Sequence, residues 1–224
     1  MLRSILSGSL GISGAVVYII SSLVVIFLTM PVHEWAHGFA AVKLGDDTPR
    51  FQGRLSLNPF AHIDYIGALC ILLFGFGWAK PVQVNGRNLR NPKRDMAFVA
   101  LAGPLANIIV AFIALLLFYL VQFVLIRTSF TYIGLIFFYI AYINIKLAVF
   151  NLIPIPPLDG SRLLSALLPY KQYYALMRYE RYIFIGLLAL LYLGVLDIPL
   201  SYLSNAVLSG LSFIAKLPFT YFLG

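Results

Sequence analysis

Long uncharged stretches occupy most of the chain and predict membrane-spanning helices. In chain order, these runs cover residues 4–32, 96–126, 128–152, 182–196 and 198–215. Lys146 is the one charge that interrupts them. A helix that crosses a bilayer needs about 20 predominantly apolar residues. The pattern therefore predicts an all-α polytopic membrane protein with about five to six transmembrane helices.

A shorter apolar run, Tyr65–Ala79, has only 15 residues and contains Gly67, Gly75 and Gly77. A helix of that length does not cross the hydrocarbon core, and glycines favour a turn within it. We therefore expect a re-entrant hydrophobic segment that enters and leaves the membrane on the same side.

The distribution of Lys and Arg predicts the orientation of the chain. If Tyr65–Ala79 is re-entrant, one side of the membrane carries twelve of these residues and the opposite side only Arg3 and Arg127. Basic residues concentrate in cytoplasmic loops. We therefore expect the polar segments at about 45–64 and 80–95 to face the cytoplasm.

The composition excludes several classes of protein. The chain is 61% hydrophobic and 11% charged, with a mean hydropathy of +0.92, whereas soluble domains are nearer a quarter charged. The single cysteine, Cys70, excludes an internal disulfide framework. The net charge of +8 is accounted for by cytoplasmic loops, so no nucleic-acid partner is expected. We expect one integral domain over residues 1–224, multi-pass in the lipid bilayer of the cell membrane.

The candidate chemistry begins at His33-Glu34-Trp35-Ala36-His37, near the end of the first apolar run. Positions i and i+4 lie on one face of a helix, so two imidazoles can bind one zinc ion while Glu34 lies beside an open coordination position. Ionisable residues within a span cost at least about 2.5 kcal/mol each on insertion scales and usually mark functional sites. The alternative is three polar residues at the membrane interface, close to Lys43 and Asp46.

Asp159 is the candidate third ligand, because a catalytic zinc needs three protein ligands and one open position. The prolines Pro154, Pro156 and Pro157 precede it and forbid a regular helix, so the span must unwind there. Irregular backbone at membrane depth is tolerated where it lines a polar cavity. The alternative is that Asp159 only caps an amphipathic helix over about Ser161–Leu168.

Two motifs in this order resemble the site-2 protease family of intramembrane zinc metalloproteases. They are His33-Glu34-x-x-His37 and Asn151-x-x-Pro154-x-x-x-x-Asp159-Gly160, and the middle span adds Gly103-Pro104-Leu105-Ala106-Asn107. The resemblance covers a zinc-binding core of about 21–168, which a C-terminal helical pair at about 180–222 follows. It is the minimal form of the family, without an inserted PDZ domain or a regulatory domain.

The resemblance implies one zinc ion per chain, bound by His33, His37 and Asp159, with Glu34 as general base. Zinc lowers the pKa of water to about 7, and Glu34 can accept the proton and pass it to the leaving amine. Asn151 would line the site and can donate a hydrogen bond to a developing oxyanion. The implied function is an intramembrane endopeptidase that cleaves transmembrane segments of other proteins, with a site open toward the cytoplasm.

Two alternatives remain at this point. One is another membrane zinc protease, such as a prenyl-protein peptidase, which uses a Glu as third ligand; the only Glu here besides Glu34 is Glu180. The other is a non-catalytic metal transporter or binder, although a transporter would carry ligands on several spans. For the protease, the expected partners are single-span membrane proteins, and the resemblance suggests anti-sigma factors or signal-peptide remnants.

Three further polar residues have weaker interpretations. His62 could approach the metal as an extra ligand or gate, or contact substrate, but we prefer a histidine bonded to Asp64 or to backbone, because most histidines are neither ligands nor catalysts. Asn107 and Asn144 are expected to form hydrogen bonds between helices.

Two short stretches alternate as strands do, namely Arg54–Leu57 and Pro81–Val84, the latter followed by a turn-forming Asn85-Gly86. Paired, they would form a small β-hairpin or sheet near the active site. A free edge, at Val82, Gln83 and Val84, could then bind the extended backbone of a substrate. The alternative is a surface hairpin that only covers the site.

Overall fold

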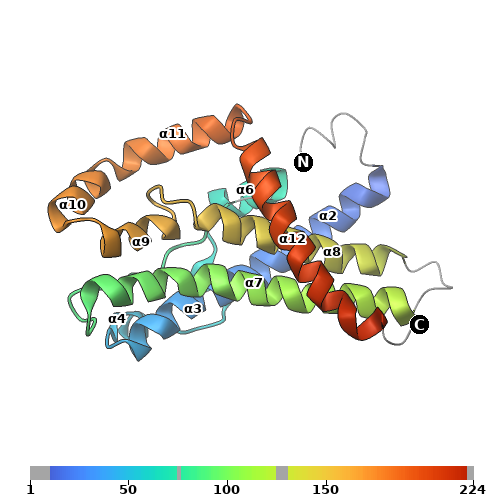
Figure 1. Cartoon of the computed structure of the whole chain (residues 1–224), viewed down its shortest axis with the longest axis horizontal. Coiled ribbons are helices and arrows are strands. Elements are labelled where there is room, and N and C mark those ends of the chain that lie inside the picture. The colour runs from blue at the N-terminus through green and yellow to red at the C-terminus, as the bar shows by residue number, and fades with distance from the viewer. Residues whose placement is uncertain (1–10, 75–76, 125–130, 221–224) are drawn as a thin grey trace.

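Helices form the whole framework of the molecule (Figure 1). The computed structural model describes residues 11–74, 77–124 and 131–220. The long elements are α2 (Ile12–Val24), the π-helix η1 (Val25–Thr29), α3 (Met30–Lys43), α7 (Pro92–Val124), α8 (Thr131–Asn151) and α12 (Asp197–Thr220). The short ones are α4 (Thr48–Phe51), α5 (Pro59–His62), α6 (Tyr65–Phe74), α9 (Asp159–Leu167), α10 (Tyr170–Arg178) and α11 (Glu180–Tyr192). The predicted all-helical class is confirmed for these residues.

Four helices of the described chain are long and apolar enough to cross a membrane. They are Ile12–Lys43, Pro92–Val124, Tyr132–Asn151 and Asp197–Thr220. The predicted five to six spans are therefore too many for the described residues. The C-terminal pair accounts for the difference, because α11 has 13 residues and falls short of a span. Such a multi-pass arrangement is typical of an integral membrane protein.

The small β-sheet predicted from Arg54–Leu57 and Pro81–Val84 is absent from the described residues, which contain no strand. The two stretches donate their backbone hydrogens elsewhere. The N–H of Arg54 donates to the carbonyl of Pro49, and the N–H of Val82 donates to a side chain of α3. The alternation of residue types therefore did not correspond to a strand in either stretch.

The chain around α6 doubles back on itself, as the re-entrant interpretation expects. The N–H of Lys80 donates to the carbonyl of His62 at 2.7 Å, so the residues on either side of the apolar run meet. A Cβ placed on Gly67 would lie 1.9 Å from the carbonyl oxygen of Trp78, so only glycine allows this approach. Gly75, a third glycine of the predicted turn, lies outside the described residues, as do Arg3 and Arg127.

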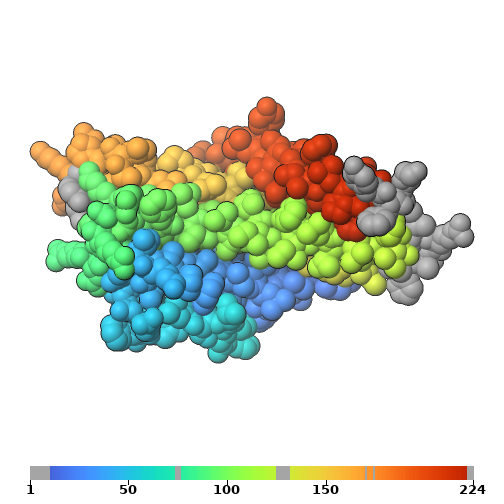
Figure 2. Space-filling view, turned by 60° about the horizontal axis from the view of Figure 1, so that its bottom comes forward, coloured from blue at the N-terminus to red at the C-terminus, as the bar shows by residue number. Residues whose placement is uncertain are grey.

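α7 lies at the centre of the bundle and packs against α3, α8, α9 and α12. Figures 1 and 2 show it running along the long axis, with α3 on one side and α12 crossing it. Small buried residues such as Ala111, Ala114 and Ala141 let the helices approach closely. The outer faces remain apolar; Ile109 and Ile113 of α7, for example, are about half exposed.

The polar segments on either side of α6 meet at one end of the bundle. The N–H of Arg90, just before α7, donates to the carbonyl of Leu44, just after α3. The carboxylate of Asp46 accepts hydrogen bonds from the backbone of Asn85 at 2.7 Å and the side chain of Asn88 at 2.9 Å. α3 and α7 therefore run antiparallel, with the end of one fixed to the start of the other.

Candidate metal centre

α3 places two histidines and a glutamate on its buried side. His33, Glu34 and His37 are only 4–6% exposed. Pro31, the second residue of α3, has no N–H and cannot donate the usual helical hydrogen bond to the preceding turn. That preceding turn is the π-helix η1, where the α-helical hydrogen-bond pattern is interrupted. From there the helix is regular, and the Nε2 atoms of His33 and His37 approach to 3.1 Å. The i, i+4 spacing thus brings both imidazoles to one point.

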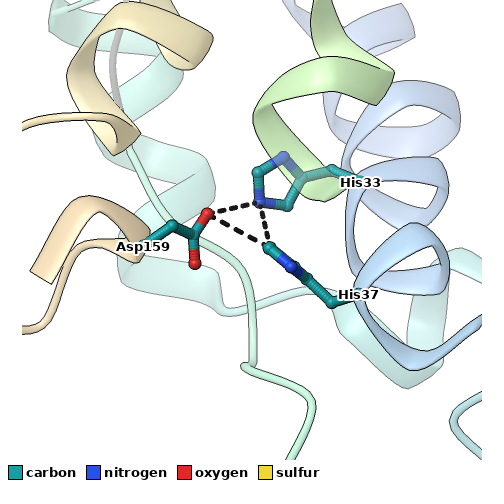
Figure 3. Close-up of side chains that lie close together, drawn as sticks. All are labelled: His33, His37 and Asp159. Carbon is teal, nitrogen blue, oxygen red and sulfur yellow. Dashed lines mark hydrogen bonds and ion pairs between the residues drawn. The ribbon is translucent and has the colours of Figure 1, made fainter. Parts of the chain in front are cut away.

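Asp159 reaches the same point from the other half of the chain (Figure 3). α8 ends at Asn151, and the proline-rich backbone stays irregular until α9 begins at Asp159. A Cβ on Gly160 would lie 2.3 Å from the carbonyl oxygen of Leu152, so glycine is required where the chain folds back. The Oδ2 atom of Asp159 lies 3.2 Å from Nε2 of His33 and 3.1 Å from Nε2 of His37. Asp159 therefore faces the histidines, and the N-cap of α9 is Leu158.

The geometry and chemistry of these three groups fit a zinc ion. The ligand atoms of a tetrahedral zinc, at about 2.0–2.2 Å from the metal, lie about 3.3 Å from one another. The separations of 3.1–3.2 Å between His33, His37 and Asp159 are close to this value. Two imidazoles and one carboxylate are also a donor set of catalytic zinc sites, which keep a fourth position open. Within the described residues, no other group of three potential ligands is this close.

α7 supports both imidazoles from behind. The Nδ1 atom of His37 lies 2.7 Å from the carbonyl oxygen of Val99, a bond that leaves Nε2 for the metal. A Cβ on Gly103 would lie 2.3 Å from Nε2 of His37 and 2.6 Å from Nε2 of His33. Gly103 therefore leaves the space that the two imidazoles occupy, a contact that its sequence position did not predict. The Gly103-Pro104 pair was the available signal, but its contact with the histidines depends on the tertiary fold.

Glu34 borders a cavity of about 190 Å³ beside the histidines. Its Oε2 atom accepts a hydrogen bond from the N–H of Val82 at 2.9 Å, which fixes the carboxylate. Asn151 lines the same cavity, as do Trp78 and Phe184. The cavity therefore combines a candidate base, a candidate amide donor and apolar walls next to the three potential ligands.

Of the remaining predicted site residues, Val82 and Val84 lie beside the site, whereas His62 lies apart from the three potential ligands. Val82 contacts Glu34, and Val84 lines a neighbouring cavity of about 240 Å³; Gln83, between them, is exposed. His62 is buried outside the ligand group, with Nε2 2.7 Å from the carbonyl oxygen of Ser56. This geometry favours the backbone-bonded interpretation of His62.

The two asparagines do not bond between helices as expected. The Nδ2 atom of Asn144 donates to the carbonyl of Ile140 on its own helix, α8. The side chain of Asn107 is fully buried in α7, and neither of its polar atoms is hydrogen-bonded to a described residue. The Nδ2 atom of Asn144 therefore bonds within its own helix rather than between helices, and no described hydrogen bond bears out the interhelical prediction for Asn107.

Comparison with known proteins gives consistent matches to one family. The family described as peptidase family M50 matches residues 21–193, which include both motifs. Curated relatives named "Putative zinc metalloprotease" include YwhC of Bacillus subtilis, 41% identical over 155 residues, with 68% of this chain and 69% of the relative covered. Rip2 of Mycobacterium tuberculosis (strain Erdman) is 30% identical over 188 residues, with 75% and 68% covered. MJ0611 of Methanocaldococcus jannaschii is 34% identical over 101 residues, with 45% and 49% covered.

No solved structure matches the chain significantly. The family match nevertheless spans most of the chain and contains His33, His37 and Asp159, which the fold brings together. The resemblance noted from the two motifs is therefore confirmed. The chain belongs to peptidase family M50, the site-2 protease family, and is a metalloprotease of the hydrolase class.

Proposed function

We propose that this protein is an intramembrane zinc endopeptidase that cleaves transmembrane segments of other membrane proteins. The observation that carries the proposal is the position of two of the three potential ligands on a helix long and apolar enough to cross a membrane. His33 precedes Lys43, the last residue of the Ile12–Lys43 span, by about 15 Å along the helix axis. At that depth, the peptide bonds within reach belong to membrane-embedded segments.

His33, His37 and Asp159 would hold one zinc ion per chain. When bound, zinc lowers the pKa of a water molecule toward neutrality and polarises a carbonyl group. Glu34 then accepts the proton of the attacking water and delivers it to the leaving amine nitrogen. Its hydrogen bond from Val82 holds the carboxylate in place between these two steps. The Asn151 amide, on the cavity wall, donates to the oxygen that becomes negative during attack.

The substrate must enter in an extended conformation. An intact helix is about 10–12 Å across, and a cavity of about 190 Å³ is smaller than an ordinary ligand pocket of about 300–1,000 Å³. An unwound segment exposes backbone N–H and carbonyl groups that need partners in apolar surroundings. The N–H groups of Gln83 and Val84 donate to no described residue, so this stretch can pair with substrate beside Glu34. Binding of the substrate backbone by Val82, Gln83 and Val84 therefore requires no preformed sheet.

The substrates proposed are single-span membrane proteins, of which anti-sigma factors and signal-peptide remnants are the classes that the family resemblance suggests. The site is proposed to open toward the cytoplasm, because the basic segments after α3 and before α7 meet at that end of the bundle. The prenyl-protease alternative loses support. Glu180 lines the separate cavity that also contains Arg162 and lies outside the ligand group.

The test is co-expression with a library of single-span proteins, comparing the wild type with Glu34→Gln. Glu180→Gln is a matched control, since it makes the same change at the only other glutamate and outside the site. We expect wild type and Glu180→Gln to generate the same shortened products and Glu34→Gln to generate none, because an amide cannot accept the proton. Identical products from all three proteins would refute the proposed role of Glu34, and no products from any would refute the protease activity on this substrate class.

A further inference from the structure

The two imidazoles of the metal centre differ in what their second nitrogen contacts. Nδ1 of His37 is bonded to the Val99 carbonyl, whereas Nδ1 of His33 is buried and has no hydrogen-bond partner among the described residues. A metal-binding histidine almost always donates its second ring N–H to an acceptor, which fixes the tautomer and the ring orientation. His33 therefore needs an acceptor close to α7, against which its ring lies (Figure 3).

Asn107, four residues after Gly103 on α7, is also a buried group whose side chain has no described hydrogen-bond partner. Its side chain is 1% exposed, and both Oδ1 and Nδ2 lack hydrogen bonds to described residues. An amide within an apolar bundle is unfavourable unless it is bonded. Neither His33 nor Asn107 has to give up an existing described bond in order to bond to the other.

The helix geometry brings these two residues to the same level. Val99, Gly103 and Asn107 are spaced four residues apart and therefore lie along one face of α7. α3 and α7 are antiparallel, so moving from His37 to His33 corresponds to moving from Val99 toward Asn107. Gly103 marks the position between them, since a Cβ there would lie 2.6 Å from Cε1 of His33, the ring atom next to Nδ1. Side chains of a helix lean toward its N-terminus, which directs the Asn107 amide toward Gly103 and the His33 ring.

We propose that Asn107 is a positioning residue whose side-chain oxygen accepts a hydrogen bond from Nδ1–H of His33, after rotation of the amide or through one bridging water. The bond holds His33 in the tautomer whose Nε2 is available to the metal. Successive turns of α7 thereby serve both histidines, with the Val99 carbonyl for His37 and the Asn107 side chain for His33. The inference rests on the proposed zinc site and adds a determinant of metal affinity to it.

The test is the zinc dissociation constant of the purified protein, measured by competition with a chelator. Loss of an outer partner of a metal-binding histidine typically weakens affinity about 10–100-fold. We expect a loss in this range for Asn107→Ala and also for Asn107→Leu, which keeps the branched shape of the side chain but replaces both polar atoms with methyl groups. Asn107→Asp retains an acceptor oxygen and should bind zinc as well as the wild type or better.

Asn144→Ala is the matched control. Asn144 is a second fully buried asparagine of the bundle, and its Nδ2 atom donates to the Ile140 carbonyl of its own helix, α8. Its replacement should leave zinc affinity unchanged. A loss of affinity in Asn144→Ala equal to that in Asn107→Ala would indicate general loosening of the bundle and would overturn the inference.

A double-mutant cycle separates a positioning role from a packing role. In a His33→Ala background, Asn107→Leu should have no further effect on zinc affinity, because the group on which it acts has been removed. An undiminished effect there, or wild-type affinity in the single Asn107 variants, would overturn the inference while leaving the metal site intact. Absence of zinc binding in the wild type would instead refute the metal site and this inference with it.

Discussion

At the scale of single residues, the metal centre depends on Gly103 having no side chain. The backbone of α7 approaches both imidazoles so closely that a methyl group would overlap Nε2 of His37 and Nε2 of His33. Those are the atoms that would bind zinc. The contact also holds the two rings between α3 and α7, so Gly103 contributes both space and orientation.

We expect Gly103→Ala to lose most of its bound zinc while retaining its helical content. The added methyl group must displace at least one imidazole, and removing one of three ligands weakens zinc binding strongly. Metal content of the purified variant, together with its circular dichroism, makes the measurement. Gly210→Ala in α12 is the control, because a Cβ there meets nothing within 4 Å. Wild-type zinc content in Gly103→Ala would show that the rings have room to move.

The hydrogen bonds to the Asp46 carboxylate, at the end of the bundle, make the stability of the fold depend on pH. Burial raises the pKa of its carboxyl, but hydrogen bonds from Thr48, Asn88 and Asn85 outweigh burial and hold the pKa below its usual range. A lowered folded pKa stabilises the fold at pH values above the unfolded pKa of about 3.9, and this contribution is lost as the pH falls through the folded value.

We therefore expect Asp46→Asn to be less stable than the wild type at pH 7, by about 1–3 kcal/mol for a buried charged acceptor that loses its bonds. The difference should shrink as the pH falls below about 4. Thermal unfolding of both proteins across this pH range measures it. A difference that stays constant down to the lowest pH would mean that ionised Asp46 does not hold the Asn85–Asn88 turn.

The residues differ in how far the sequence could predict them. His33, Glu34 and His37 were recognisable because helical spacing is local, and Asp159 because prolines interrupt the helix just before it. The contacts of Val99 and Gly103 with the histidines were not recognisable, since they arise between helices that lie more than 60 residues apart in the chain. That the buried Asn107 side chain has no described hydrogen-bond partner was not recognisable from the sequence either.

At the scale of elements, the stretch Pro81–Val84 after α6 is proposed to bind the backbone of the substrate. Residues Pro81–Val84 pass from the cavity at Glu34 to the neighbouring cavity that Val84 lines. The alternating pattern predicted a strand, which the described residues do not form here. The partner of Val82 is a carboxylate of α3, a pairing that strand propensity does not describe.

We expect Gln83→Pro to lower cleavage sharply while zinc content stays constant, because proline removes the backbone N–H offered to substrate. Gln83→Ala keeps that N–H and removes only the exposed side chain, so it should retain wild-type turnover. Cleavage of a single-span substrate and metal content are measured for both variants. Full activity of Gln83→Pro would show that the Gln83 N–H does not bind substrate, and the role of this stretch would then be limited to the hydrogen bond from Val82 to Glu34.

At the scale of the whole molecule, the segments that share a side of the membrane depend on whether the run that contains α6 re-enters or crosses. Its flanking residues His62 and Lys80 are hydrogen-bonded, so the polar segments before and after α6 belong to one end of the bundle. The number of spans was overestimated from sequence because the 15-residue run at 182–196 was counted as a span, whereas α11 has only 13 residues and ends at Tyr192. Hydropathy does not show where a helix ends within an apolar stretch.

Site-directed labelling tests this topology. In a Cys70→Ser background, single cysteines at Arg54 and Arg87 should react with a membrane-impermeant thiol reagent from the same side, which the basic residues predict to be cytoplasmic. A cysteine at Tyr132, at the far end of α8, should react only from the opposite side. Labelling of the first two positions from opposite sides would require α6 to cross the membrane.

The central claim is that zinc at His33, His37 and Asp159 supports hydrolysis within a membrane-spanning segment. Its most direct test is to incubate the purified, zinc-loaded protein in liposomes with one single-span protein and to locate the new chain ends by mass spectrometry. The account predicts a cut inside the apolar span of the substrate, present with the wild type and absent with Asp159→Ala. A cut confined to the water-exposed parts of the substrate, or one that persists in Asp159→Ala, would contradict it.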